Sequence, residues 1–146
     1  MFKFFQRGGL LLKFGRSGKP HYRHFSLNES KTKLKWVSQK KQKDQTVIRV
    51  RDMSVLFVGQ KSEVFTNSKF ADPQKDAVSF SIYYHAPETE RQKKVADCDD
   101  DKEVLPLRSL DIVCKDEEEF NIWAEGLRWL IANKNSLVDV GFESKC

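Results

Sequence analysis

The sequence predicts one strong amphipathic helix, and it comes last along the chain. Asp116 is placed to cap its N-terminus, and the three glutamates that follow lie in the first turn, where the helix dipole favours negative charge. The apolar residues after them recur at helical spacing and form one stripe: Phe120, Trp123, Leu127, Leu130 and Ile131. Because strands and helices do not alternate along this chain, a parallel sheet is not expected.

Short strand-like segments fill the chain ahead of this helix, each marked by alternation or by β-branched and aromatic residues. Turn residues separate the first two, since positions 15–20 hold two glycines, a serine and a proline. Residues 63–70 are compatible with a helical turn. The predicted strands are 10–14, 22–27, 34–38, 47–50, 55–58, 78–84 and 107–114. The sequence therefore predicts a mainly β fold of seven short strands followed by one helix.

Basic residues are concentrated in the first part of the chain. Residues 1–61 contain 15 Lys and Arg against three acidic residues, a balance of +12, whereas residues 62–146 carry −7 within a net charge of +5. Such a distribution indicates one face of strong positive potential, suited to phosphate-bearing partners. A solvated surface without a ligand is the alternative interpretation.

The length of 146 residues fits a single domain, and no apolar run approaches the roughly 20 residues that span a bilayer. The three cysteines show neither a disulfide nor a zinc spacing, and a reducing, cytoplasmic location is the plain interpretation. The acid-free stretch 1–28 faintly resembles a mitochondrial transit peptide, but its second half alternates like strands.

The sequence offers no pattern for an enzyme, a metal site or a cofactor. The three histidines share no ligand spacing with cysteines or acids, and the nucleophile-elbow, P-loop and dinucleotide fingerprints are missing. The acidic run 97–103 lacks the alternation and the glycine of a calcium loop, so a solvated loop is the preferred interpretation. Trp36 and Trp123 are expected in the core rather than stacked on bases, and no nucleic-acid partner is predicted.

The first hairpin and the last helix of the chain resemble the pleckstrin-homology superfold. Leu11–Phe14, a basic turn and Tyr22–Leu27 are similar to its first hairpin, and residues 123–131 resemble its C-terminal helix, with Trp123 in the characteristic position. The first-strand LLK, Trp36, Phe80-Ser81-Ile82 and residues 110–116 look like the phospholipase C delta type. The resemblance implies a seven-stranded antiparallel barrel or sandwich capped by the helix. Its expected organisation is a lead-in segment over 1–7, the domain over 8–134 and a tail over 135–146.

The resemblance also implies a binding site for an inositol phosphate, formed by the first two strands, their loop and residues after the third strand. Lys13 matches the lysine at the end of the first strand, Arg23 matches the second-strand arginine, and Lys41 matches a lysine after Trp36. Gln39 replaces a hydroxyl residue. The expected phosphoinositide-binding residues are Lys13, Arg16, Lys19, Arg23, Gln39 and Lys41.

Physical chemistry supports this site independently of the resemblance. Lys13 and Arg23 lie on neighbouring strands joined by a short loop, so their side chains can meet at its open end. Arg binds phosphate through two parallel hydrogen bonds, and Lys acts as a mobile point charge. Two residues depart from the phospholipase-type site that the resemblance implies. Gly15 stands where that site has a second lysine, and His21 stands where Arg or Lys is common. Both departures weaken recognition of adjacent phosphates.

Three functions follow from these observations. The leading hypothesis is a non-enzymatic module that binds phosphoinositides or an anionic membrane surface from the cytoplasm, as a peripheral membrane protein. The second is a protein-interaction scaffold, similar to the domains of engulfment-and-motility scaffolds, with the acidic loop docking a basic partner. The third is the N-terminal piece of a larger lipase or exchange factor. The sequence does not specify the lipid, the protein partner or the oligomeric state.

Overall fold

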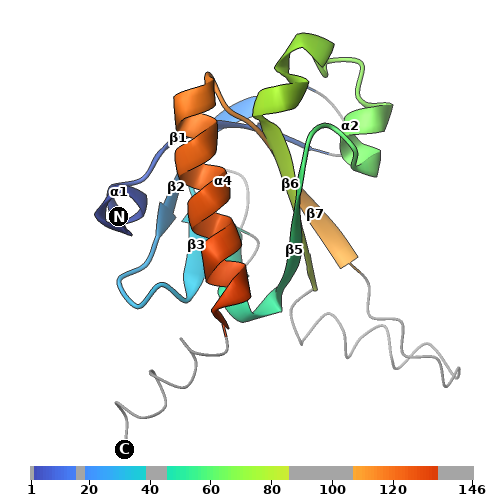
Figure 1. Cartoon of the computed structure of the whole chain (residues 1–146). Helices are drawn as coiled ribbons and strands as arrows, with labels where there is room; N and C mark the ends of the chain where they lie inside the picture. Colours follow the sequence, from blue (N-terminus) through green and yellow to red (C-terminus); the bar gives the residue numbers. More distant parts are fainter. Residues whose placement is uncertain (1, 16–18, 39–45, 86–106, 135–146) are drawn as a thin grey trace, which may run out of the picture.

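The computed structural model describes residues 2–15, 19–38, 46–85 and 107–134 (Figure 1). Seven antiparallel strands form one bent sheet in the order β4-β3-β2-β1-β7-β6-β5. The strands are β1 (Gly9–Phe14), β2 (His21–Leu27), β3 (Lys33–Trp36), β4 (Val47–Arg49), β5 (Met53–Val58), β6 (Ser79–His85) and β7 (Leu107–Val113). The helices are α1 (Phe2–Arg7), α2 (Glu63–Asn67) and α4 (Glu117–Ala132), and two 3-10 helices are η2 (Val50–Asp52) and η3 (Pro73–Val78).

The predicted fold class is confirmed, with one qualification about closure. The ladder ends at β4 on one edge and at β5 on the other, and within the described residues these two strands are joined through η2 rather than paired. Helix α4 contacts β5, η2 and η3 and covers the inner side of the bent sheet (Figure 1). The fold is therefore a partly open barrel whose gap is covered by a helix.

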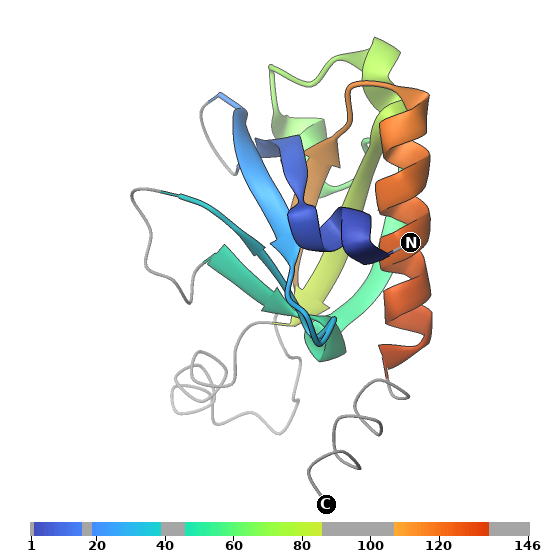
Figure 2. The same ribbon diagram turned by 90° about the vertical axis from the view of Figure 1, so that its left-hand side faces the viewer.

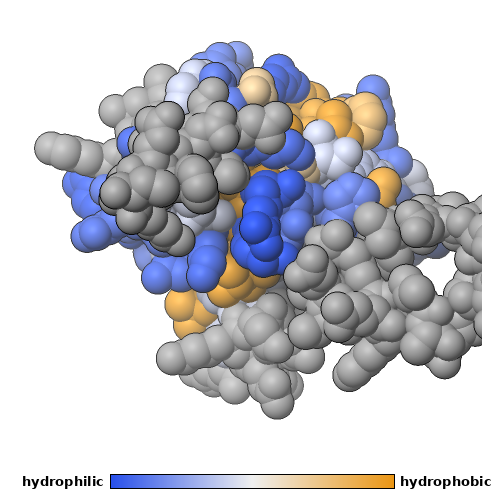
Figure 3. Space-filling view, turned by 90° about the horizontal axis from the view of Figure 1, so that it is seen from below, coloured by the Kyte–Doolittle hydropathy of each residue, from blue (hydrophilic) through white to orange (hydrophobic). Residues whose placement is uncertain are grey.

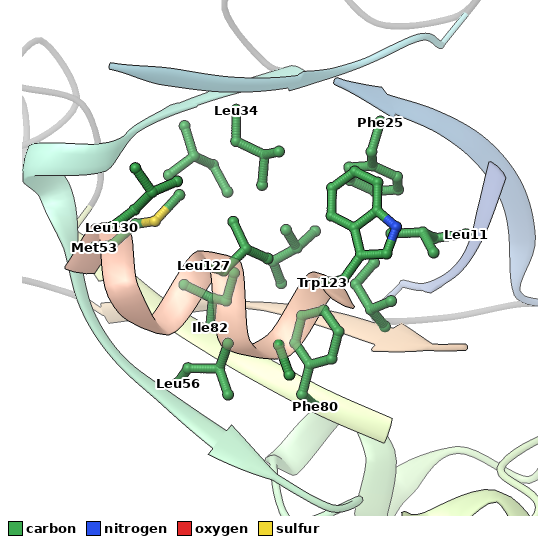
Figure 4. Packing of buried hydrophobic residues seen from close by; sticks show 14 of the residues in the cluster. Leu11, Phe25, Leu34, Met53, Leu56, Phe80, Ile82, Trp123, Leu127 and Leu130 are labelled. Carbon is green, nitrogen blue, oxygen red and sulfur yellow. The ribbon is translucent and has the colours of Figure 1, made fainter. Parts of the chain in front are cut away.

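The main core lies between the inner face of the sheet and α4. Trp123, Leu127 and Leu130 project from the helix towards buried residues of the strands (Figure 4). The side chain of Asp116 accepts a hydrogen bond from the backbone N–H of Glu119 at 2.9 Å, which confirms the predicted N-cap. The strand and linker residues buried in this core include Leu11, Phe25, Leu34, Trp36, Ile48, Met53, Leu56, Phe80, Ile82, Leu110 and Ile112.

A smaller cluster lies on the outer face of the sheet beneath α2. Phe14 and Val113 pack there against Phe65, whose ring centroid is 5.0 Å from that of Phe14. The buried carboxylate of Asp111 accepts hydrogen bonds from the hydroxyls of Ser62, Ser81 and Ser109, at 2.5, 2.7 and 2.9 Å. Ser62 also caps α2 by accepting from the N–H of Phe65. The carboxylate thus ties α2 to β6 and β7.

The structure adds a helix where the sequence predicted only a lead-in segment. Residues 2–7 form α1, and Phe5 is buried, with its ring centroid 4.9 Å from that of Trp123 in an edge-to-face arrangement. A six-residue helix is too short to be stable by itself, so this packing is what stabilises it. The sequence also did not predict η3, whose last residue is Val78, the expected start of β6. Strand bounds shift by a few residues: β5 begins at Met53 rather than at residue 55, and β3 ends at Trp36 rather than at residue 38.

Candidate functional site

The register of β1 against β2 places Lys13 and Arg23 on the same face of the sheet. Lys13 lies opposite His21, and Leu11 lies opposite Arg23. Leu11 is buried in the core, so its face is the inner one, and residues two apart or directly opposite share it. Lys13, His21 and Arg23 therefore line the inner side of the barrel end beyond the core. This cationic end is called the mouth.

Trp36 forms the floor beside the mouth. The Nζ atom of Lys13 lies 5.5 Å from the centroid of the Trp36 ring, which is within range of a cation–π interaction. Phe25 supports this ring from β2, with its centroid 5.4 Å away. Lys13 is accordingly half-buried, with its ammonium group directed across β2 towards β3.

The other basic residues of the mouth are more exposed. Arg23 is half-buried and donates from Nη1 to the carbonyl oxygen of Tyr22 at 3.2 Å, a contact on its own strand that a phosphate oxygen can replace. Lys19, two residues before β2, and His21, the first residue of β2, are exposed. Three members of the predicted set, Arg16, Gln39 and Lys41, lie outside the described residues, so their assignment stays a prediction.

The whole first part of the sheet is free of acidic side chains. Strands β1 to β4 contain Lys13, Arg23, Lys33, Lys35 and Arg49 but neither Asp nor Glu. Among the acids close to these strands, Glu29 is exposed in the turn between β2 and β3, and Asp52 in η2 pairs with Arg49 at 3.0 Å. These strands extend to the side away from α4, whose first turn carries three glutamates (Figure 2). An anion approaching this side meets positive potential from both faces of the sheet.

Sequence reasoning assigned Trp36 to the core and missed its position beside the mouth. Trp36 is indeed buried, with 7% of its surface exposed, but its ring also contacts the Lys13 ammonium. The alternation pattern offered the signal, because it places Trp36, Phe25 and Lys13 on one face. The pattern does not show how far a bent sheet brings β3 towards β1.

The described residues contain no group of three or more His, Cys, Asp or Glu side chains arranged to hold a metal ion. None of their helices is both long and apolar enough to cross a bilayer. Hydrophilic residues dominate the described surface seen from below, and hydrophobic ones form smaller patches between them (Figure 3).

Comparison with known families decides what this fold is. The model of the pleckstrin homology domain family matches residues 2–132, which is nearly the whole chain. The chain belongs to the pleckstrin homology domain family. The match includes residues 2–7, so α1 lies within the region shared with the family.

Curated relatives point to the phospholipase C type of this domain. The chain is 23% identical over 133 residues to the human Inactive phospholipase C-like protein 2 and 26% identical over 136 residues to the human Inactive phospholipase C-like protein 1. These alignments cover 91% and 93% of this chain but only 10% and 11% of the relatives. The chain therefore spans about a tenth of the length of the curated relatives it matches.

Solved structures agree on the fold. The crystal structure of PLC21 from S. officinalis superposes with a TM-score of 0.61 at 10% sequence identity, covering 89% of this chain and 16% of that one. Inner Membrane Complex Sub-compartment Protein 3 from Toxoplasma gondii superposes with a TM-score of 0.54, also at 10% identity, covering 92% of this chain and 82% of that one. At such low identities the likeness extends to the fold alone.

Proposed function

We propose that this pleckstrin homology domain is a non-enzymatic module that binds phosphoinositide headgroups, or the anionic membrane surface that displays them, through its mouth. The observation that carries the proposal is the common inner face of Lys13 and Arg23 at the end of β1 and β2. Lys19 extends the same basic end, and the resemblance adds Arg16, Gln39 and Lys41. We place the protein in the cytoplasm, in peripheral contact with a membrane.

Three features of the mouth suit a phosphate ligand. The guanidinium of Arg23 can present two parallel donors to one phosphate, while Lys13 supplies a point charge beside it. Trp36 holds the Lys13 ammonium over its ring, which reduces the freedom that Lys13 loses on binding. Each basic residue near an anionic leaflet contributes about 1 kcal/mol, so the few cations here support reversible binding.

The test is binding to phosphatidylcholine vesicles that contain a phosphatidylinositol bisphosphate. Replacing both Lys13 and Arg23 with Ala removes about 2 kcal/mol and is expected to weaken binding about thirtyfold. The matched control replaces Lys61 and Arg128, which are exposed and lie outside the mouth, and therefore removes the same two charges. Equal losses in the two variants, or no loss in the first, would contradict the proposal.

A protein-interaction scaffold is the second candidate. It is favoured by the two departures at Gly15 and His21 and by apolar side chains on the outer face of β5 and β7, where Phe57 and Leu107 are 48% and 52% exposed. This function predicts that the chain binds a defined protein partner and that replacing Phe57 with Ala abolishes that complex. Vesicle binding that depends on Lys13 and Arg23 decides for the first candidate instead.

A further inference from the structure

Three large apolar side chains are exposed together on the outer face of β1 to β3. Leu10, Tyr22 and Val37 have exposed fractions of 61%, 63% and 63%, the highest among the large apolar residues of the described chain. They lie on the side of the strands opposite the core, because their neighbours Leu11 and Trp36 are buried. These three residues are called the outer patch.

The strand register makes the outer patch continuous. Leu10 lies opposite His24, and the backbone N–H of Val37 donates to the carbonyl oxygen of His24 at 3.2 Å. Leu10, His24 and Val37 therefore form one row across the sheet. Tyr22 lies two residues before His24 on the same face, diagonal to Leu10, at a separation of about 7–8 Å that aromatic side chains bridge. The row and Tyr22 together therefore present one apolar surface, which the imidazole of His24 interrupts.

The charges around the outer patch specify an anionic occupant. Lys35 is exposed on the same face, opposite Ser26, and Lys33 lies two residues before it. Because the four strands contain no Asp or Glu, nothing on them repels a negatively charged surface. Tyr, with an apolar ring and a polar hydroxyl, is a side chain that membrane interfaces favour.

We propose that the outer patch is a second membrane-contacting surface, which inserts Leu10, Tyr22 and Val37 among the headgroups and upper acyl chains of an anionic bilayer. The inference rests on the membrane binding proposed above and assigns it a second, apolar component. The first two strands are basic on their inner face, at Lys13 and Arg23, and apolar on their outer face. A bilayer that receives this end of the first two strands contacts both of their faces at once.

The test replaces the outer patch with threonine, which retains β propensity and removes most apolar contact. The Leu10→Thr, Tyr22→Thr, Val37→Thr variant is expected to bind vesicles of phosphatidylcholine and phosphatidylserine in equal parts about tenfold more weakly than the unaltered chain. Its binding of soluble inositol trisphosphate at the mouth is expected to be unchanged. The matched control, Val55→Thr, Phe57→Thr, Leu107→Thr, replaces three exposed apolar residues on the outer face of β5 and β7 and is expected to retain vesicle binding.

Several outcomes would overturn the inference. The inference fails if the outer-patch variant binds vesicles as well as the unaltered chain does. It also fails if the control variant loses as much vesicle binding as the outer-patch variant. A self-associated chain that becomes monomeric in the outer-patch variant shows that a second copy covers the patch, and a protein partner that competes with vesicles for the patch shows that the surface binds protein.

If Lys13 and Arg23 prove dispensable for vesicle binding while the outer patch is required, the mouth proposal fails and the outer-patch proposal stands. If the chain binds inositol trisphosphate but not vesicles, the mouth proposal stands and the outer-patch proposal fails.

A fluorescence measurement locates the patch directly. A Tyr22→Trp variant is expected to gain emission that lipids brominated in the upper acyl chain quench. A Phe57→Trp variant, on the other half of the sheet, is expected to gain emission that these lipids leave unquenched. Equal quenching of the two added tryptophans, or none, contradicts insertion at the outer patch.

Discussion

Gly126 of α4 lies directly against the ring of Phe5 of α1. A Cβ atom placed there would lie 2.2 and 2.4 Å from Cζ and Cε2 of the Phe5 ring. Phe5 is buried and packs against Trp123, so it cannot move away without losing that contact. The absence of a side chain at Gly126 therefore allows α1 to dock.

Replacing Gly126 with Ala is expected to destabilise the domain. Overpacking costs about 1–3 kcal/mol, and the better helix propensity of Ala offsets about 1 kcal/mol of that. Urea unfolding followed by tryptophan fluorescence measures the change. The clash requires Phe5, so the same substitution in a Phe5→Ala background is expected to cost less or to stabilise. Equal effects in both backgrounds would rule out the clash as the cause.

His21 stands beside Lys13 where a permanently charged residue would strengthen the mouth. Because Lys13 and His21 are direct cross-strand neighbours, His21→Arg adds a donor pair next to the Lys13 ammonium. A gain of about 1 kcal/mol, or about fivefold in vesicle affinity, is expected. Co-sedimentation with vesicles containing a phosphatidylinositol bisphosphate checks it, with Ser54→Arg at an exposed position of β5 as the control. An equal gain at Ser54 would indicate a charge effect unrelated to the mouth.

The buried thiol of Cys114 is expected to lower the stability of the domain at alkaline pH. Burial, together with the nearby charges of Glu119 and Asp116, raises the pKa of the thiol from 9.0 to about 12. The unfolded chain releases this proton at lower pH than the folded one. The contribution of the protonated thiol to the free energy of unfolding is therefore complete below pH 9 and is lost as pH rises towards 12. The free energy of unfolding is expected to fall more steeply in this range than in a Cys114→Ala variant, by up to about 1.4 kcal/mol per pH unit. Parallel pH profiles from urea unfolding would contradict this.

At the scale of elements, α2 depends on one buried carboxylate. Asp111 accepts from three serine hydroxyls, one of which caps α2. Asp111→Ala leaves these hydroxyls without their acceptor and is expected to lower the free energy of unfolding by about 3 kcal/mol. Amide hydrogen exchange within α2 should also accelerate. Ser109→Ala removes a single donor and is expected to cost less, so equal losses would argue against a shared network.

The sequence predicted most elements because their patterns are local. Alternation located the seven strands to within a few residues, and Asp116 with its glutamates located the start of α4. Helix α1 escaped prediction because its stability comes from the contact of Phe5 with Trp123 and Gly126, more than a hundred positions away in the chain. Buried Asp111 escaped for the same reason, since its partners come from separate elements.

The candidate site was predictable in part. Period-two alternation suffices to place Lys13 and Arg23 on a common face once their strands are paired. The proximity of Lys13 to Trp36 depends on the bend of the sheet across β2, which no local pattern encodes. The exposed row of Leu10 and Val37 likewise needed the observed register and solvent exposure.

At the scale of the whole molecule, charge is divided between two sides. The acid-free strands β1 to β4 lie away from α4, whose N-terminus carries Glu117, Glu118 and Glu119 (Figure 2). If the domain binds an anionic membrane as proposed, this asymmetry is expected to orient it with the basic side towards the lipid. The same asymmetry allows a chain with a modest net charge of +5 to present one strongly basic side.

Salt dependence tests this electrostatic orientation. Raising the salt from about 0.1 M to about 1 M shortens the screening length from about 10 Å to about 3 Å, so vesicle binding through the mouth is expected to weaken strongly. The part of the affinity that comes from the outer patch should persist, because apolar contacts are not screened. Binding that is insensitive to salt would show that the basic strands contribute little.

The most direct test of the mouth is a nuclear magnetic resonance titration of the chain with soluble inositol trisphosphate. The account predicts that the largest amide shifts cluster at Lys13, His21 and Arg23, that the indole N–H of Trp36 shifts with them, and that α4 is unaffected. Shifts confined to other parts of the fold, or saturable vesicle binding without any shift at these residues, would contradict it.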